Sequence, residues 1–107
     1  MTESVPSSPS PSGNHTLIVI PTYNEMSTLP TILGDIWANV PGAHVLIVDD
    51  SSPDGTGEWA DNRREGEDRL HVLHRPAKSG LATAYVDGIG WGIDHGYPFI
   101  LQMDADG

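Results

Sequence analysis

Two patterns of apolar residues alternate along the chain. Short continuous apolar runs, bounded by turn residues, are typical of strands that are buried on both faces. The predicted strands are residues 16–20, 44–48, 70–74 and 99–103. Between them, apolar residues recur with helical spacing or follow capping and turn residues. The predicted helices are residues 29–40, 56–65 and 81–95. This β-α-β-α-β-α-β order predicts an α/β fold with a mainly parallel sheet and flanking helices.

Turn and capping residues set the expected boundaries of these elements. Pro21 is expected to end the first strand, because proline lacks the N–H that a central strand needs. Ser27 or Thr28 is expected to cap the first helix, and Thr56 the second. The third helix contains three glycines, each costing about 1 kcal/mol relative to alanine, and at most some of them should mark close packing. These glycines are Gly88, Gly90 and Gly92.

The chain divides into a tail and one small domain. Residues 1–14 are rich in serine and proline and have almost nothing apolar to bury, so they are predicted to be a disordered tail. Residues 15–107 are predicted to form the domain. Because the sequence stops directly after the last predicted strand, we expect it to be the N-terminal portion of a longer protein, truncated on its C-terminal side. No apolar run approaches the roughly 20 residues that span a bilayer.

The charge balance excludes one class of partner. The chain carries 15 acidic residues against 5 lysines and arginines, for a formal net charge of −10. Nucleic-acid binding needs a basic face, so we expect no nucleic-acid partner. The acidic excess fits either a protein that holds a cation or one that is simply well solvated. With no cysteine, disulfides and cysteine-ligated zinc are excluded.

Polar loops follow three of the predicted strands. They contain residues 23–25, then Asp49 and Asp50, and finally Asp104 and Asp106. The carboxyl ends of parallel strands meet at one edge of a sheet, where ligands of open α/β folds bind, so these carboxylates should converge. Like charges brought together need a cation or hydrogen-bond donors to compensate.

The carboxylates have alternative roles. Each acid could instead cap a following helix, which suits Asp54 well and one of Asp49 and Asp50 fairly. Two carboxylates two residues apart, such as Asp104 and Asp106, can both reach one Mg²⁺ or Mn²⁺ ion that keeps substrate phosphates as further ligands. The Asp49–Asp50 pair is a second candidate for the metal.

Four segments, in order, resemble the motifs of family 2 glycosyltransferases. Within that family they are most similar to dolichol-phosphate or polyprenol-phosphate mannose synthases of the actinobacterial kind. The segments are IPTYNE at 20–25, VDDSSPDGT at 48–56, KSGLATAY at 78–85 and MDADG at 103–107. The resemblance covers nearly everything except the tail. It implies that residues 15–107 are the Rossmann-like nucleotide-binding half of a GT-A fold.

The resemblance also implies roles for individual residues. Asp104 and Asp106 match the pair that binds Mg²⁺ or Mn²⁺, and Asp49 matches the acid that hydrogen-bonds the nucleobase. Lys78 could offset phosphate charge, or it could be a solvated loop lysine. The residues matched to nucleotide binding are Pro21, Tyr23, Glu25, Asp49 and Lys78. The family's acceptor-side residues have no counterpart here, so catalytic residues stay unassigned, and His71, His74 and His95 are interpreted as structural.

The implied activity is inverting transfer of mannose from GDP-mannose to a polyprenyl (dolichyl) monophosphate. The chain would supply the donor-binding portion, inactive alone, of a cytoplasmic enzyme acting at the cytoplasmic face of a membrane. One alternative is a family 2 transferase that uses UDP-glucose or UDP-N-acetylglucosamine. Two others are a haloacid-dehalogenase-like phosphohydrolase, with Asp104 as nucleophile, and a non-enzymatic phospho-receiver domain.

Overall fold

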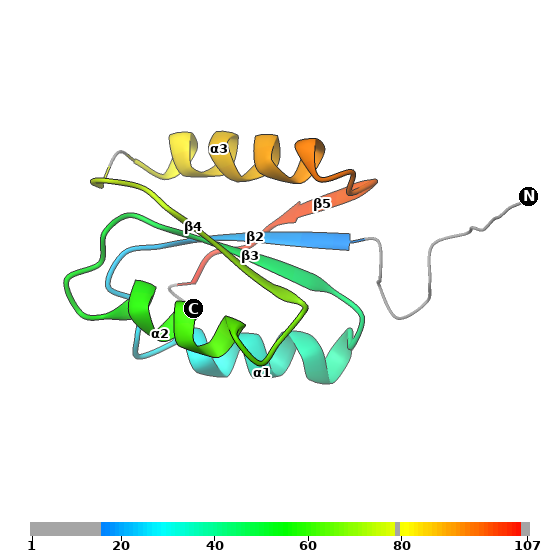
Figure 1. Cartoon of the computed structure of the whole chain (residues 1–107), viewed down its shortest axis with the longest axis horizontal. Helices are drawn as coiled ribbons and strands as arrows, with labels where there is room; N and C mark the ends of the chain where they lie inside the picture. The colour runs from blue at the N-terminus through cyan, green and yellow to red at the C-terminus, as the bar shows by residue number, and fades with distance from the viewer. Residues whose placement is uncertain (1–15, 79, 106–107) are drawn as a thin grey trace, which may run out of the picture.

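Four parallel strands form a single sheet in the order β4-β3-β2-β5 (Figure 1). The structure is a computed structural model that describes residues 16–78 and 80–105, so the predicted tail lies outside the described residues. The strands are β2 (Thr16–Thr22), β3 (His44–Asp49), β4 (Leu70–His74) and β5 (Phe99–Gln102). The helices are α1 (Leu29–Asn39), α2 (Thr56–Arg64) and α3 (Leu81–Asp94). The predicted parallel α/β fold is confirmed.

The helices lie in two layers, with α1 and α2 on one face of the sheet and α3 on the other (Figure 1). From β2 the chain moves outward through α1, β3, α2 and β4, and then returns through α3 to place β5 on the other side of β2. Right-handed crossovers that run in opposite directions put their helices on opposite faces. This Rossmann-like order makes the carboxyl ends of β2 and β5 a topological switch point, where ligands of such sheets bind.

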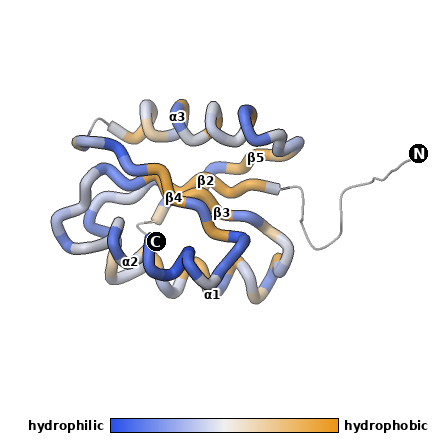
Figure 2. The backbone as a smooth tube through the Cα atoms, viewed as in Figure 1, coloured by the Kyte–Doolittle hydropathy of each residue, from blue (hydrophilic) through white to orange (hydrophobic). Residues whose placement is uncertain are grey.

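The core has two halves because successive strand residues face opposite sides of the sheet. Ile18, Ile20 and Ile47 pack with α1, while Val19 and Leu46 belong to a smaller cluster on the α3 side. Figure 2 shows the apolar stretches of β2 and β3 running between the helical layers. Every residue of β3 from Val45 onward is buried, as a continuous apolar run predicts.

Two glycines let α3 lie close to the sheet. A Cβ atom on Gly88 would clash with Val19 Cγ1, and one on Gly92 would lie 2.8 Å from Leu17 Cδ2. These glycines are four residues apart and so share a helix face, whereas a Cβ atom on Gly90 would meet nothing within 4 Å. The expectation that only some of the three mark close packing is confirmed.

The prediction that Pro21 ends the first strand is wrong, because β2 continues to Thr22. Neighbouring residues of a strand direct their backbone groups to alternate sides. The Val19 carbonyl accepts from the Met103 amide beyond β5, and the Thr22 carbonyl accepts from the Asp50 amide beyond β3. The Pro21 nitrogen therefore lies on the β5 side, past the last pair of that ladder (Val19 with Gln102), where no N–H is needed.

The capping predictions need two corrections. Thr56 is the first residue of α2, and its N-cap is Gly55 with a left-handed φ of +87°. The Asp54 carboxylate accepts from the Thr56 amide at 3.0 Å, so Asp54 satisfies a free N–H group at the start of α2. This agrees with the alternative in which Asp54 caps a following helix. Thr28 does occupy the N-cap of α1, but its hydroxyl donates to the Ala105 carbonyl instead of capping.

Candidate functional site

A pocket of about 170 Å³ opens at the carboxyl ends of β2 and β3, beside the start of α3. Its lining comes from three separate segments of the chain. The lining residues are Pro21, Thr22, Tyr23, Glu25, Asp50, Lys78, Gly80, Leu81 and Ala84. Four of the five residues predicted to bind a nucleotide are therefore brought together here, and the fifth, Asp49, is not.

A cation lies on the pocket wall over an aromatic ring. The Lys78 ammonium lies 4.7 Å from the centroid of the Tyr23 ring, within the range of a cation–π contact. The two residues come from the loops that follow β2 and β4. The arrangement offers an incoming ligand both an aromatic surface and a positive charge.

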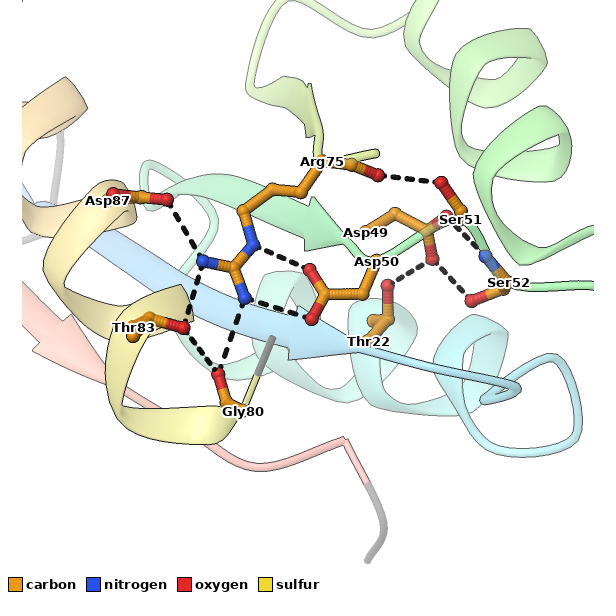
Figure 3. A network of polar contacts seen from close by, with 9 residues as sticks. All are labelled: Thr22, Asp49, Asp50, Ser51, Ser52, Arg75, Gly80, Thr83 and Asp87. Atoms are coloured by element: carbon orange, nitrogen blue, oxygen red, sulfur yellow. Dashed lines mark hydrogen bonds and ion pairs between the residues drawn. The ribbon is translucent and has the colours of Figure 1, made fainter. Parts of the chain in front are cut away.

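The adjacent acids Asp49 and Asp50 point to opposite faces of the sheet, because successive residues at the end of β3 alternate. Asp49 turns toward α2 and is 1% exposed. Its Oδ1 accepts from the hydroxyls of Thr22 at 2.7 Å and Ser52 at 2.6 Å, and its Oδ2 accepts from the Ser52 amide at 3.1 Å (Figure 3). Asp50 turns toward α3 and lines the pocket.

The Asp49 carboxylate borders a second, polar hollow of about 340 Å³ at the start of α2. A Cβ atom on Gly57 would lie 2.7 Å from Asp49 Oδ2, so only glycine lets α2 begin this close to the strand end. Across the hollow, His74 Nε2 lies 2.9 Å from both carboxylate oxygens of Asp61. This pairing agrees with the structural role predicted for His74.

Asp50 forms a buried bidentate ion pair with Arg75, the residue after β4 (Figure 3). Arg75 Nε and one terminal nitrogen donate to the two Asp50 oxygens at 2.6 and 2.9 Å. The guanidinium also donates to Asp87 at 2.9 Å, to the Thr83 hydroxyl at 3.1 Å and to the Gly80 carbonyl at 3.3 Å. The hydrogen bonds to Asp50 contribute most to raising the pKa of Arg75, against the opposing effect of burial.

Arg75 was not predicted from the sequence to have a role in the site. A signal was present in the alternation of β4. Leu73 packs on the α3 side, so Arg75, two residues later, falls on the same side as Asp50. A cation and a carboxylate that end neighbouring strands on one face are placed to pair.

The predicted metal pair is described for one member only. Asp104 follows β5 and is exposed, and its Oδ1 accepts from the Tyr85 hydroxyl of α3 at 2.8 Å. Asp106 lies outside the described residues. Within residues 16–78 and 80–105, no group of three or more histidine, aspartate or glutamate side chains is placed to hold a metal ion.

A second polar cluster lies at the opposite end of the sheet and is aromatic. The Tyr97 hydroxyl lies 2.7 Å from His44 Nδ1 and 3.3 Å from His71 Nε2, and the two imidazole nitrogens are 3.3 Å apart. Burial is the main cause that lowers the pKa of both histidines and raises the pKa of Tyr97. Trp91 stacks on His95 with centroids 3.8 Å apart. These contacts agree with the structural roles predicted for His71 and His95.

None of the helices in the described part of the chain has the length and apolar character to cross a membrane.

The chain is similar to two actinobacterial proteins. It is 53% identical over 91 residues to the undecaprenyl-phosphate mannosyltransferase of Micrococcus luteus, covering 85% of this chain and 37% of that protein. It is 50% identical over 93 residues to the polyprenol monophosphomannose synthase of Mycolicibacterium smegmatis, covering 86% of this chain and 35% of that protein. The chain thus spans about a third of the length of these relatives.

Solved structures share the fold. The mannosyltransferase PcManGT from Pyrobaculum calidifontis, in complex with GDP-Man and Mn²⁺, matches with a TM-score of 0.68 at 22% identity over 86% of this chain and 27% of that chain. Staphylococcus aureus TarS matches with a TM-score of 0.65 at 22% identity over 85% of this chain and 16% of that chain. Both are GT-A glycosyltransferases, so the predicted fold class is confirmed. Residues 17–107 match the model of glycosyl transferase family 2, and the chain belongs to that family.

Proposed function

We propose that the chain is the donor-binding part of an inverting glycosyltransferase that moves mannose from GDP-mannose to a polyprenyl monophosphate. The observation that carries the proposal is the sequence identity to two relatives, 53% and 50%. One is named as an undecaprenyl-phosphate mannosyltransferase and the other as a polyprenol monophosphomannose synthase. The GDP-Man and Mn²⁺ bound to the structural neighbour PcManGT support the same donor. Membership of family 2 does not favour the phosphohydrolase or phospho-receiver alternatives.

The pocket offers groups suited to a nucleotide. Pro21 and Tyr23 provide apolar surface for a base, Glu25 and Asp50 provide acceptor oxygens, and Lys78 provides a cation for phosphate. A volume of about 170 Å³ suits the base rather than a whole nucleotide sugar. The position of Asp50 on this wall favours it over Asp49 as the carboxylate that reads the base.

The divalent ion belongs at the carboxyl end of β5. We assign Asp104 and Asp106 as its protein ligands, with Mg²⁺ or Mn²⁺ as the ion. The exposed Asp104 carboxylate offers the hard oxygen donors these ions prefer, and the Tyr85 hydroxyl orients it. Such ions are usually held by one or two carboxylates plus substrate phosphates, so a larger cluster is not needed. When bound, the ion would neutralise charge that develops on the leaving diphosphate.

The described residues bind and orient the donor. The acceptor phosphate is already an anion at neutral pH, so its attack on the sugar needs little general-base help. Polyprenyl phosphate is confined to a bilayer while the nucleotide sugar is water-soluble. The whole protein is therefore proposed to act at a membrane surface, on the cytoplasmic face.

Calorimetric titration of the whole protein tests the proposal. GDP-mannose, UDP-glucose and UDP-N-acetylglucosamine are compared, with and without Mn²⁺. We expect GDP-mannose to bind most tightly and only weakly once the metal is removed. Tighter binding of a UDP-sugar would mean that the donor is that sugar nucleotide and not GDP-mannose. Labelling of Asp104 by acetyl phosphate would favour the phosphohydrolase or phospho-receiver alternatives instead.

A further inference from the structure

We propose that Arg75 is a positioning residue for donor binding, which holds the Asp50 carboxylate and the Gly80 carbonyl in the places from which both residues line the pocket. This inference rests on the proposed function, because it takes the pocket at the ends of β2 and β3 to be the donor site. Nothing in the sequence motifs assigns a role to this residue.

Every donor of the guanidinium is used inside the protein. An arginine side chain has five N–H donors, and Arg75 makes five hydrogen bonds, two of them to Asp50. The side chain is 8% exposed, and Arg75 is not among the residues that line the pocket. Arg75 therefore acts on a ligand through the residues it holds rather than by touching the ligand.

The held residues come from two different walls. Asp50 directly follows β3, while Gly80 precedes α3 with a positive φ of 100°. The Gly80 carbonyl also accepts from the Thr83 hydroxyl at 3.0 Å and from the Ala84 amide at 3.2 Å, so Arg75 ties the first turn of α3 to the strand end. Without these hydrogen bonds, the distance between Asp50 and the first turn of α3 would no longer be fixed.

Lysine cannot replace the arginine here. Its ammonium is a compact charge with three donors and cannot meet a carboxylate with two parallel hydrogen bonds while also reaching Gly80 and Asp87. The Arg75→Lys variant therefore keeps the charge but loses the geometry. Arg69 offers a matched control, because it also makes a bidentate pair, with Glu67, but precedes β4 at the other end of the strand.

Steady-state kinetics of the whole protein, with varied donor and saturating acceptor, test the positioning role. In Arg75→Lys we expect KM for the donor to rise at least about tenfold with kcat nearly unchanged, since misplaced binding groups weaken donor binding. Arg69→Lys should leave the donor KM unchanged. A fall in kcat with an unchanged donor KM in Arg75→Lys would show loss of folded enzyme only and would overturn the proposal.

Two further measurements keep the test decisive. Thr83→Val removes one acceptor of Arg75 at an exposed position outside the pocket lining, and it should raise the donor KM by about two- to fivefold even if Arg75→Lys folds poorly. If none of the three nucleotide sugars binds to the wild type, the proposed function fails on its own. Hydrogen exchange of the Ala84 amide then tests the role of Arg75 separately. Faster exchange in Arg75→Lys than in Arg69→Lys would support the proposal that Arg75 holds the first turn of α3. Equal exchange in the two variants would overturn it.

Discussion

The two ends of β3 and β4 carry polar clusters of opposite character on the same face of the sheet. At the carboxyl end, Asp50 and Arg75 form a charged network whose oxygens and nitrogens are shared with α3. At the amino end, His44, His71 and Tyr97 satisfy one another as neutral rings, also beside α3. The same strands and the same helix therefore support a charged, ligand-facing end and an uncharged, structural end.

The contrast between the two ends indicates where a ligand can bind along this sheet. A carboxylate buried beside a guanidinium stays charged and keeps a fixed direction, so it can present oxygen atoms to a ligand. The neutral cluster uses its polar atoms internally and lines neither the pocket beside α3 nor the hollow beside α2. Variants at the two ends should therefore differ in how strongly they change stability and donor binding.

The largest effect is expected from Arg75→Leu at the charged end. Removal of one partner from a buried ion pair leaves an uncompensated charge, so the free energy of unfolding should fall by about 3–5 kcal/mol. Urea denaturation of the whole protein measures it. Adding Asp50→Leu should restore part of the loss, because an apolar pair needs no compensation. If Arg75→Leu were as stable as the wild type, the carboxyl end would not depend on a buried charged network, and the proposed contrast between the two ends of the strands would be wrong.

The two adjacent acids are expected to differ in their effect on donor affinity. Asp50→Asn should raise the donor dissociation constant about tenfold or more. Asp49→Asn should lower the free energy of unfolding by about 1–3 kcal/mol, because one of the two oxygens that accept from Thr22 and Ser52 becomes an NH2 donor. Calorimetric titration and denaturant unfolding are run on both variants. A larger loss of donor affinity in Asp49→Asn would return the nucleobase role to Asp49, as the sequence motif alone suggested.

Helix α3 connects the two ends, and its glycines test how closely it must lie. Gly88→Ala should cost about 1–3 kcal/mol, because its methyl group would clash with Val19. Gly90→Ala should instead stabilise by roughly 0.5–1 kcal/mol, since its Cβ atom meets nothing within 4 Å and alanine favours a helix. Thermal unfolding of the pair of variants measures both. A stabilising Gly88→Ala would mean that α3 does not rest on the sheet.

The smallest effect should appear at the neutral end as a dependence on pH. Burial lowers the pKa of His44 and His71 below their ordinary value of 6.5, so below pH 6.5 the unfolded chain binds more protons than the folded one. Stability should therefore fall as the pH drops below 6.5. For His44, nearby Arg69 also lowers the pKa and Glu67 opposes it. The pKa of Glu67 is itself lowered to about 2, so that group does not titrate in this window.

Unfolding midpoints between pH 5 and 8 measure this dependence. The double variant His44→Asn/His71→Asn should flatten the curve over that range. An unchanged curve in the double variant would place the acid sensitivity elsewhere in the molecule.

Much of the fold was predictable, because buried parallel strands and an amphipathic helix leave strong periodic signals. The errors fall where local chemistry depends on neighbours distant in sequence. Pro21 can lie within β2 because the ladder with β5 ends before it. Thr56 is not the N-cap of α2, because the loop before it passes through Gly55, which has a left-handed conformation and takes that position. Neither fact is visible in a local window of sequence.

The site shows the same limit. The structure places four of the predicted nucleotide-binding residues in one pocket, because parallel topology brings these loops to one edge of the sheet: Pro21, Tyr23, Glu25 and Lys78. The choice between Asp49 and Asp50 requires knowing which residue of a strand faces which helix layer. Arg75 went unrecognised because a lone loop arginine shows its role only when the carboxylate of another strand is placed beside it.

The alternation at the end of β3 also limits how the sequence can change in length. Deleting one residue between Val45 and Val48 would turn every later side chain of the strand to the other layer. Asp50 would then take the place of Asp49 beside the Thr22 hydroxyl, Asp49 would take the buried place of Val48, and Ser51 would face the Arg75 guanidinium. Insertions and deletions in related sequences should therefore fall in the loops between elements, while β3 keeps a constant length.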